Sequence, residues 1–132
     1  MRIPVALACV LLPIAASAQQ ANQSPTSNQS VKIATGLTYQ TLIPAGKNMR
    51  SLTMQNNNGT DSCWIEVSGL VTSGMTTGSS VTPVGLPAIT AQQASIFLPA
   101  GASYSRYYPL IPSGPIVGTC AANTDSIYLD IQ

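Results

Sequence analysis

Apolar and polar residues alternate with a two-residue period along several short segments of this chain, which is the pattern of a half-buried β-strand. In residues 49–56, Leu52 and Met54 fall on one face, and serine, threonine and glutamine fall on the other. Residues 126–131 alternate in the same way, with three aliphatic residues on one face. No segment holds an uninterrupted apolar stripe of 3.6-residue period, so the sequence predicts strands and not helices.

The predicted strands share this alternation or a short apolar run bounded by turn residues, and they are residues 32–34, 37–43, 49–56, 62–68, 95–98, 103–110, 116–122 and 126–131. The stretch between them, residues 69–94, is rich in glycine, threonine and serine. It predicts one or two short edge strands on a long excursion. Seven to eight short strands separated by turns predict an all-β fold, either an antiparallel β-sandwich or a Greek-key barrel.

Turn-forming residues separate these strands. Asn56 to Gly59 lies between two alternating segments, and Asn-Gly favours a tight turn because both residues tolerate positive φ. We therefore expect residues 49–56 and 62–68 to form a hairpin, with Cys63 toward the core and Glu66 on the outer, solvated face. The related sequences of residues 42–46 and 97–101, both ending in Pro-Ala-Gly, predict one kind of turn used twice.

The beginning of the chain has the features of a secretory signal peptide, residues 1–18. A basic start, an apolar stretch and small residues before Gln19 are what export and cleavage require. Residues 19–30 predict a disordered or extended lead-in, and residues 31–132 the β-sandwich domain. Cleavage removes Cys9 and leaves Cys63 and Cys120, which we expect to form a disulfide in the periplasm or outside the cell. No later apolar stretch approaches the ~20 residues of a membrane-spanning helix.

Charged residues make up only 7% of the sequence. After cleavage four basic and four acidic residues remain, so nucleic acid is not an expected partner. The surface must consist mainly of hydroxyl and amide groups, which repel neighbouring molecules weakly. Two interpretations remain open: an ordinary secreted surface, or one that packs against copies of itself as a homo-oligomer or against another coat.

The chain has no histidine, which excludes Ser-His-Asp and Cys-His catalysis and removes the commonest ligand of zinc and copper. We expect no enzymatic activity, no cofactor and no metal. Four carboxylates could in principle supply a glycosidase pair, for which Glu66 and Asp125 are the candidates. Solvated surface charge is the expectation for both.

Aromatic residues gather near one arginine in residues 104–108. On a strand, Tyr104, Arg106 and Tyr108 share one face, and Tyr107 lies on the other. Tyrosine and arginine are favoured at binding hot spots, so these four residues form the predicted recognition surface for a protein or glycan. The alternative is that one or two of the tyrosines close the edge of the sandwich.

Three segments have a familiar order: RSLTMQNNNGTDSCWIEV, then SIFLPAGASYSRY, then CAANTDSIYLDIQ. They resemble small β-sandwich proteins of phage and prophage origin, over residues 49–69 and 95–132. The resemblance implies a virion accessory or decoration role. The signal peptide departs from that pattern, because virion proteins are assembled in the cytoplasm.

The sequence therefore predicts an exported, non-enzymatic structural or adhesive binding module at or outside the cell surface. Alternatives are a phage-derived accessory or decoration protein, and a small carbohydrate-active enzyme or inhibitor. A pilin-like subunit that donates residues 19–30 as a strand is a further hypothesis.

Overall fold

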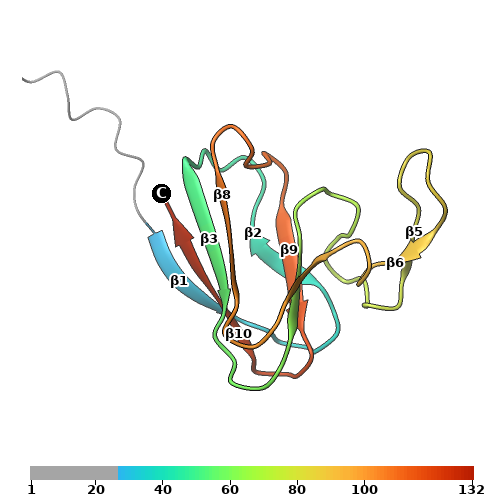
Figure 1. The fold of residues 1–132 in the computed structure, drawn as a ribbon, viewed down its shortest axis with the longest axis horizontal. Helices are drawn as coiled ribbons and strands as arrows, with labels where there is room; N and C mark the ends of the chain where they lie inside the picture. The colour runs from blue at the N-terminus through green and yellow to red at the C-terminus, as the bar shows by residue number, and fades with distance from the viewer. Residues whose placement is uncertain (1–26) are drawn as a thin grey trace, which may run out of the picture.

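The chain folds into two facing antiparallel sheets from which a two-stranded arm projects (Figure 1). The structure is a computed structural model and describes residues 27–132, so the predicted signal peptide lies outside the described residues. The first sheet has the order β1-β10-β3-β8, the second β2-β9-β4-β7, and the arm contains β5 and β6. The bounds are β1 Ser27–Lys32, β2 Gln40–Ile43, β3 Ser51–Asn56, β4 Cys63–Glu66, β5 Ser80–Val81, β6 Ile89–Thr90, β7 Ile96–Leu98, β8 Ser103–Tyr107, β9 Ile116–Cys120 and β10 Ser126–Ile131. The described residues contain no helix, and the predicted antiparallel β-sandwich is confirmed.

The main core lies between the two sheets and follows the alternation of the sequence. Leu52 and Met54 of β3 and Leu129 of β10 are fully buried, and so is Ile65 of β4 in the opposite sheet. Each such side chain contributes roughly 1.5–3 kcal/mol through removal of its apolar surface from water. The polar residues between them point to the outer face of the first sheet.

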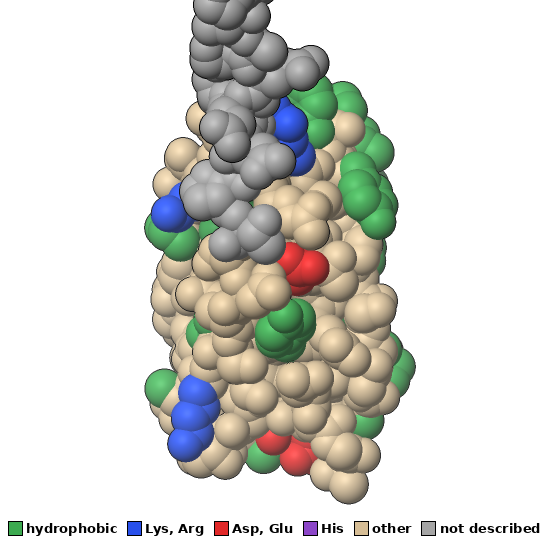
Figure 2. Space-filling model, turned by 90° about the vertical axis from the view of Figure 1, so that its left-hand side faces the viewer, with side chains coloured by type: hydrophobic (Ala, Val, Ile, Leu, Met, Phe, Trp, Pro, Cys, Tyr) green, Lys and Arg blue, Asp and Glu red, His purple; other side chains and the backbone are tan. Residues whose placement is uncertain are grey.

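That outer face is a flat, weakly charged surface. Asn28, Asp130, Thr53 and Ser105 form one row across β1, β10, β3 and β8, and the hydroxyls of Thr53 and Ser105 lie within 2.9 Å of each other. Figure 2 shows the side of the molecule where β1 lies, and Lys, Arg, Asp and Glu side chains occupy little of its visible part. The outer face of the first sheet therefore carries few formal charges.

The two central strands of the second sheet, β4 and β9, are buried on both faces. The outer face of this sheet carries Trp64 and Val117, which pack with Val81 and Ala91 of the excursion in a second apolar cluster. The excursion, residues 69–94, therefore covers the outer face of this sheet, and the arm projects from it. The prediction of one or two short strands within these residues is confirmed as β5 and β6. Because both faces are covered, all five residues of β9 are buried and its sequence shows no alternation.

Tyr39 joins the sandwich to the segment that covers it through hydrogen bonds. Its hydroxyl donates to the carbonyl of Ala91 at 3.2 Å and lies 2.6 Å from Oγ of Ser95. Burial raises the pKa of the Tyr39 hydroxyl above its usual 10.0; the negative charge of Glu66 adds to this shift, and the hydrogen bond with Ser95 opposes it.

Glu66 is buried, which corrects the prediction that it lies in solvent. Its side chain is 1% exposed beneath the cover. The carboxylate accepts hydrogen bonds from the backbone N–H groups of Ser68 at 2.5 Å, Gly69 at 2.9 Å and Val71 at 3.4 Å, and from the Ser68 hydroxyl. These donors replace water and compensate for burial of the charge, and they fix the turn that begins the excursion.

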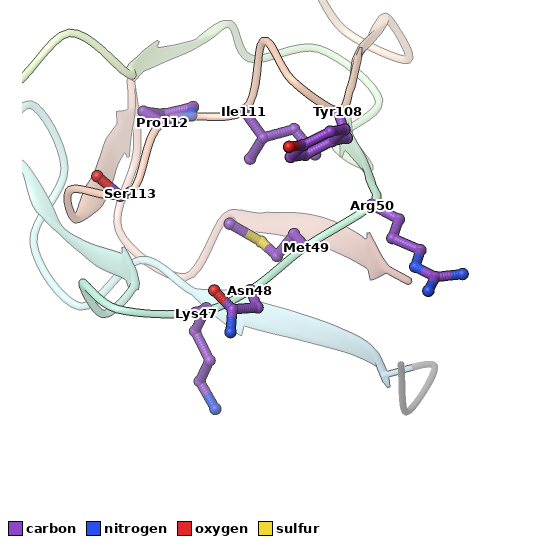
Figure 3. A pocket seen from close by; sticks show the side chains of 8 residues that line it. All are labelled: Lys47, Asn48, Met49, Arg50, Tyr108, Ile111, Pro112 and Ser113. Carbon is purple, nitrogen blue, oxygen red and sulfur yellow. The ribbon is translucent and has the colours of Figure 1, made fainter. Parts of the chain in front are cut away.

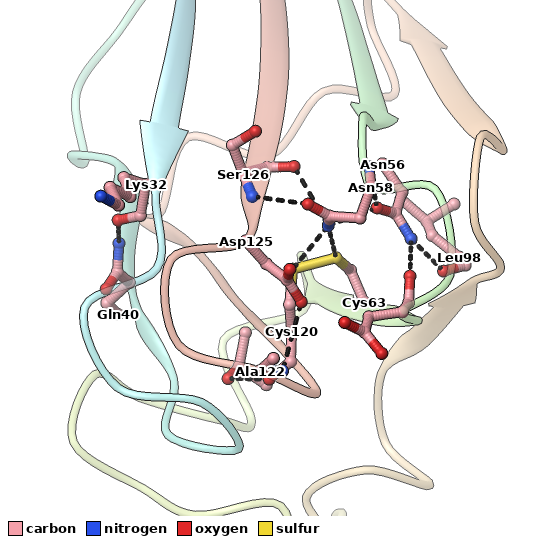
Figure 4. The surroundings of a disulfide bond; sticks show 12 residues. Lys32, Gln40, Asn56, Asn58, Cys63, Leu98, Cys120, Ala122, Asp125 and Ser126 are labelled. Carbon is pink, nitrogen blue, oxygen red and sulfur yellow. Dashed lines mark hydrogen bonds between the residues drawn. A yellow bond between two sulfur atoms is a disulfide. The ribbon is translucent and has the colours of Figure 1, made fainter.

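β3 and β4 do not form the predicted hairpin, because the chain crosses from the first sheet to the second between them. The asparagine side chains stabilise this crossover through hydrogen bonds and do not form a two-residue turn (Figure 4). Asn56, fully buried, donates to the carbonyls of Asp61 at 2.8 Å and Leu98 at 3.0 Å. Asn58 donates from its backbone and its side chain to Oδ1 of Asn56, and its own Oδ1 accepts from the backbone N–H of Ser126 at 3.0 Å.

The predicted disulfide between Cys63 and Cys120 is confirmed. The two residues lie directly opposite each other on neighbouring strands, β4 and β9, and both are fully buried as expected. Nδ2 of Asn58 lies 3.4 Å from Sγ of Cys63 (Figure 4). A buried disulfide is compatible with an oxidising, exported environment.

β1 begins inside the segment predicted as a disordered or extended lead-in. Residues 27–30 are the first four residues of a strand that pairs with β10 from Ser27 opposite Ile131 to Lys32 opposite Ser126. Of the two predicted alternatives, disordered or extended, these four residues are extended and not disordered, and residues 19–26 lie outside the described residues. The sequence of β1 does not alternate between apolar and polar residues, because the strand is held mainly by backbone pairing. Only Val31 packs against the core.

One kind of turn passes the chain from the second sheet to the first in two places. Residues 42–46 connect β2 to β3 and residues 97–101 connect β7 to β8. Gly46 at φ 80° and Gly101 at φ 73° adopt the left-handed conformation that each turn requires. The two turns thus share a glycine in the left-handed conformation. The first of these turns leads directly into the candidate site.

Candidate functional site

An open hollow lies between two segments, residues 47–50 before β3 and residues 108–113 after β8. Backbone hydrogen bonds join the segments at both ends: Gly46 N–H donates to the Ser113 carbonyl at 3.0 Å, and Tyr108 N–H donates to the Arg50 carbonyl at 2.8 Å. The space between has a volume of about 720 Å³ and is lined by Lys47, Asn48, Met49, Arg50, Tyr108, Ile111, Pro112 and Ser113. The two segments are therefore joined to each other at both ends of the hollow.

The interior of the hollow is apolar and its rim is polar. In Figure 3 the side chains of Met49 and Ile111 point into the space between the segments, and Lys47 and Arg50 point away from it. Met49 is buried and Ile111 half-buried, while the rim residues Lys47, Asn48 and Arg50 are exposed. None of the eight lining residues is acidic. The hollow thus combines a small apolar floor with an electropositive rim.

Of the four predicted recognition residues, only Tyr108 lines this hollow. Tyr104 and Arg106 share the inner face of β8, as predicted, but at the edge of the sandwich, where Tyr104 is half-buried against the core. The Arg106 guanidinium lies 5.6 Å from the Tyr104 ring centre, donates to the Tyr104 hydroxyl and donates to the Leu110 carbonyl at 3.0 Å. Arg106 therefore holds the segment that forms one wall of the hollow.

The other two tyrosines are exposed. Tyr107 is 65% exposed on the outer face of the first sheet, opposite Ser51. Tyr108 follows the strand, is 77% exposed and lines the hollow. The structure therefore brings one of the four predicted residues to the hollow and shows that Tyr104 closes the sandwich edge.

The segment of residues 47–50 was not among the predicted site residues. The available signal was the concentration of two of the four cations of residues 27–132, Lys47 and Arg50, directly after a Pro-Ala-Gly turn. A second, smaller hollow of about 320 Å³ shares Lys47, Asn48 and Met49 with the first and extends to Ser27 on β1. The exposed polar surface beside the first hollow is therefore concave as well.

The tip of the arm is a separate feature. Val84 is fully exposed and Leu86 is 62% exposed, and the tip lies between Pro83 and Pro87. Leu86 N–H donates to the Pro83 carbonyl at 3.1 Å, which closes a tight turn. The arm projects from the body of the molecule (Figure 1), and residues 67–105 contain no charged residue. The arm ends in two aliphatic groups that no other part of residues 27–132 covers.

The two carboxylates considered as a glycosidase pair are engaged in local structure. Glu66 is bound by its own turn, and Oδ2 of Asp125 accepts from the backbone N–H of Ala122 at 3.2 Å. Within residues 27–132, no three histidine, cysteine or acidic side chains come together as a metal site would need. The same residues contain no helix long and apolar enough to cross a membrane.

No protein-family model matches the chain, and comparison with curated proteins and with solved structures finds no match.

Proposed function

We propose that this chain is an exported, non-enzymatic binding module that attaches to a surface ligand through the hollow between residues 47–50 and 108–113. The observation that carries the proposal is the exposed Tyr108 ring beside an apolar floor and an electropositive rim. Exposed aromatic groups next to cations are the composition of binding hot spots. The buried disulfide supports export.

The hydrogen bonds that join the walls of the hollow also support a binding role. Hydrogen bonds at both ends of the two segments and the Arg106 contact with Leu110 fix the walls. A preformed site loses less conformational entropy when it binds than a flexible one does. The sandwich behind the hollow supplies the fixed framework.

The test compares two neighbouring tyrosines. Tyr108→Ala should weaken attachment of the fluorescently labelled chain to cell surfaces or extracted envelope material, because Tyr108 lines the hollow. Tyr107→Ala is the matched control, since Tyr107 is the same residue type, similarly exposed, but lies on the outer face of the first sheet. If both variants attach as strongly as the unaltered chain and their urea midpoints are unchanged, the proposal is wrong.

A second candidate function is assembly on or with a particle, as expected of a phage-derived accessory or decoration protein. The exposed Val84 and Leu86 on an uncharged arm favour it, because covering exposed aliphatic groups with a partner lowers the free energy of the system. Val84→Ser with Leu86→Ser should abolish any self-association or particle binding measured by sedimentation. Unchanged sedimentation of the double variant would exclude the arm as the contact.

A further inference from the structure

We propose that the ligand of the hollow is an extended anionic polysaccharide, with a sugar ring seated beside Tyr108 and acidic groups against Lys47 and Arg50. This inference rests on the proposed function, because it names the class of ligand for the same site. It follows from the placement of charge, from the chemistry of the rim and from the size of the apolar floor.

The described residues carry few cations, and these are unevenly placed. Residues 27–132 contain Lys32, Lys47, Arg50 and Arg106, and the last is bound to Tyr104 and Leu110. Two of the remaining three stand at the rim of one hollow that has no acidic lining residue. An anion is therefore the charged group that this rim complements.

The geometry favours a long ligand over a small ion. Lys47 and Arg50 lie at the two ends of one wall segment and point away from the hollow (Figure 3). Three residues of chain span at most about 10 Å, so the two Cα atoms stand no further apart than this. A small anion inside the hollow would not meet side chains that point outward. A chain that crosses the rim and carries a charge on successive units would meet both.

The rim chemistry favours sugar over lipid or peptide. Tyr108 offers an exposed ring face, Asn48 an amide and Ser113 a hydroxyl. A pyranose presents C–H groups that pack on an aromatic face and hydroxyls that pair with amide and hydroxyl groups. The apolar floor offers little area to an acyl chain, because Met49 is only 7% exposed, and the exposed aliphatic tip of the arm lies elsewhere in the fold.

The experiment measures binding of the full chain to polygalacturonate and to the same polymer with its carboxylates methyl-esterified. The acidic polymer should bind and the neutral ester should bind at least about tenfold more weakly, because the charge-assisted contacts are lost. Lys47→Gln and Arg50→Gln should each weaken binding of the acidic polymer about threefold to tenfold, and added salt should weaken it further. Lys32→Gln removes the same charge from the end of β1 away from Ser27 and should leave affinity unchanged.

The outcomes separate this inference from the proposed function. Equal binding of acidic and esterified polymers, or no binding of either, overturns the anionic polysaccharide. If attachment to cells still depends on Tyr108, the binding module remains. Polyglutamate or phosphatidylglycerol vesicles that bind as tightly as polygalacturonate, with the same dependence on Lys47 and Arg50, show that a peptide or a membrane is the partner and overturn the sugar. Urea midpoints of all variants confirm that each is folded.

Discussion

Replacement of Asn56 tests whether buried amide contacts or turn propensity hold the crossover between the sheets. The Asn56 side chain is fully buried and makes four hydrogen bonds, two donated to Asp61 and Leu98 and two accepted from Asn58. Asn56→Ala removes all four and leaves the Leu98 carbonyl buried without that donor. At about 1 kcal/mol for each net hydrogen bond, we expect a loss of about 3–4 kcal/mol in the free energy of unfolding.

The assay is urea unfolding at pH 7, followed by fluorescence of Trp64, the single tryptophan, which is 8% exposed. Asn57→Ala is the matched control, because Asn57 is an exposed neighbour of the same type, and its loss should change stability by less than about 0.5 kcal/mol. Asn56→Asp should destabilise at least as much as alanine, since it turns a carboxylate toward two carbonyls. Equal losses for Asn56→Ala and Asn57→Ala would show that the asparagines act through turn propensity, and the reasoning would fail.

Three further predictions concern the two cores and the disulfide. Gly118→Ala should cost about 1–3 kcal/mol in urea unfolding, because a Cβ there would lie 2.6 Å from Cδ1 of Leu42 and 3.1 Å from the Trp64 carbonyl; an unchanged midpoint would contradict this packing. Stability should fall as the pH rises above 10.0, the usual pKa of tyrosine, because the folded state keeps the Tyr39 proton longer than the unfolded state does; Tyr39→Phe should lose part of that slope in denaturation at increasing pH. Reduction of Cys63–Cys120, whose residues are separated by 57 positions, should lower the free energy of unfolding by about 2–4 kcal/mol, and an equal urea midpoint with and without reductant would refute it.

The sequence predicted best those strands that have one buried and one solvated face. β3 and β10 are such strands, and their apolar residues lie in the core as expected. For β4 the strand and its inward residues were predicted, but the expected solvated face was wrong, because Trp64 and Glu66 face the cover formed by the excursion. A second buried face removes the polar half of the pattern, so the alternation no longer tells which side meets water. β1 was missed for the opposite reason, because backbone pairing requires no apolar residue.

The hairpin prediction failed because a local signal was outweighed by long-range contacts. An Asn-Gly pair favours a tight turn, but here the asparagine side chains pair with Leu98 and Ser126, which are distant in sequence. The candidate site was predictable only in part for the same reason. Tyr108 stood out as an aromatic residue near an arginine, whereas Lys47 and Arg50 join it only after residues 46 and 113 meet in space.

The disulfide has a mechanical consequence. It joins Cys63 to Cys120 within the centre of one sheet, so a force applied through the two ends of the chain bypasses the 57 positions between them. About 200 Å of chain contour is thereby withheld from extension as long as the bond is intact. A single-molecule pulling experiment should show the unfolding step lengthen by about this amount when the bond is reduced. Under load, a module tied in this way lengthens by less than its number of residues would allow.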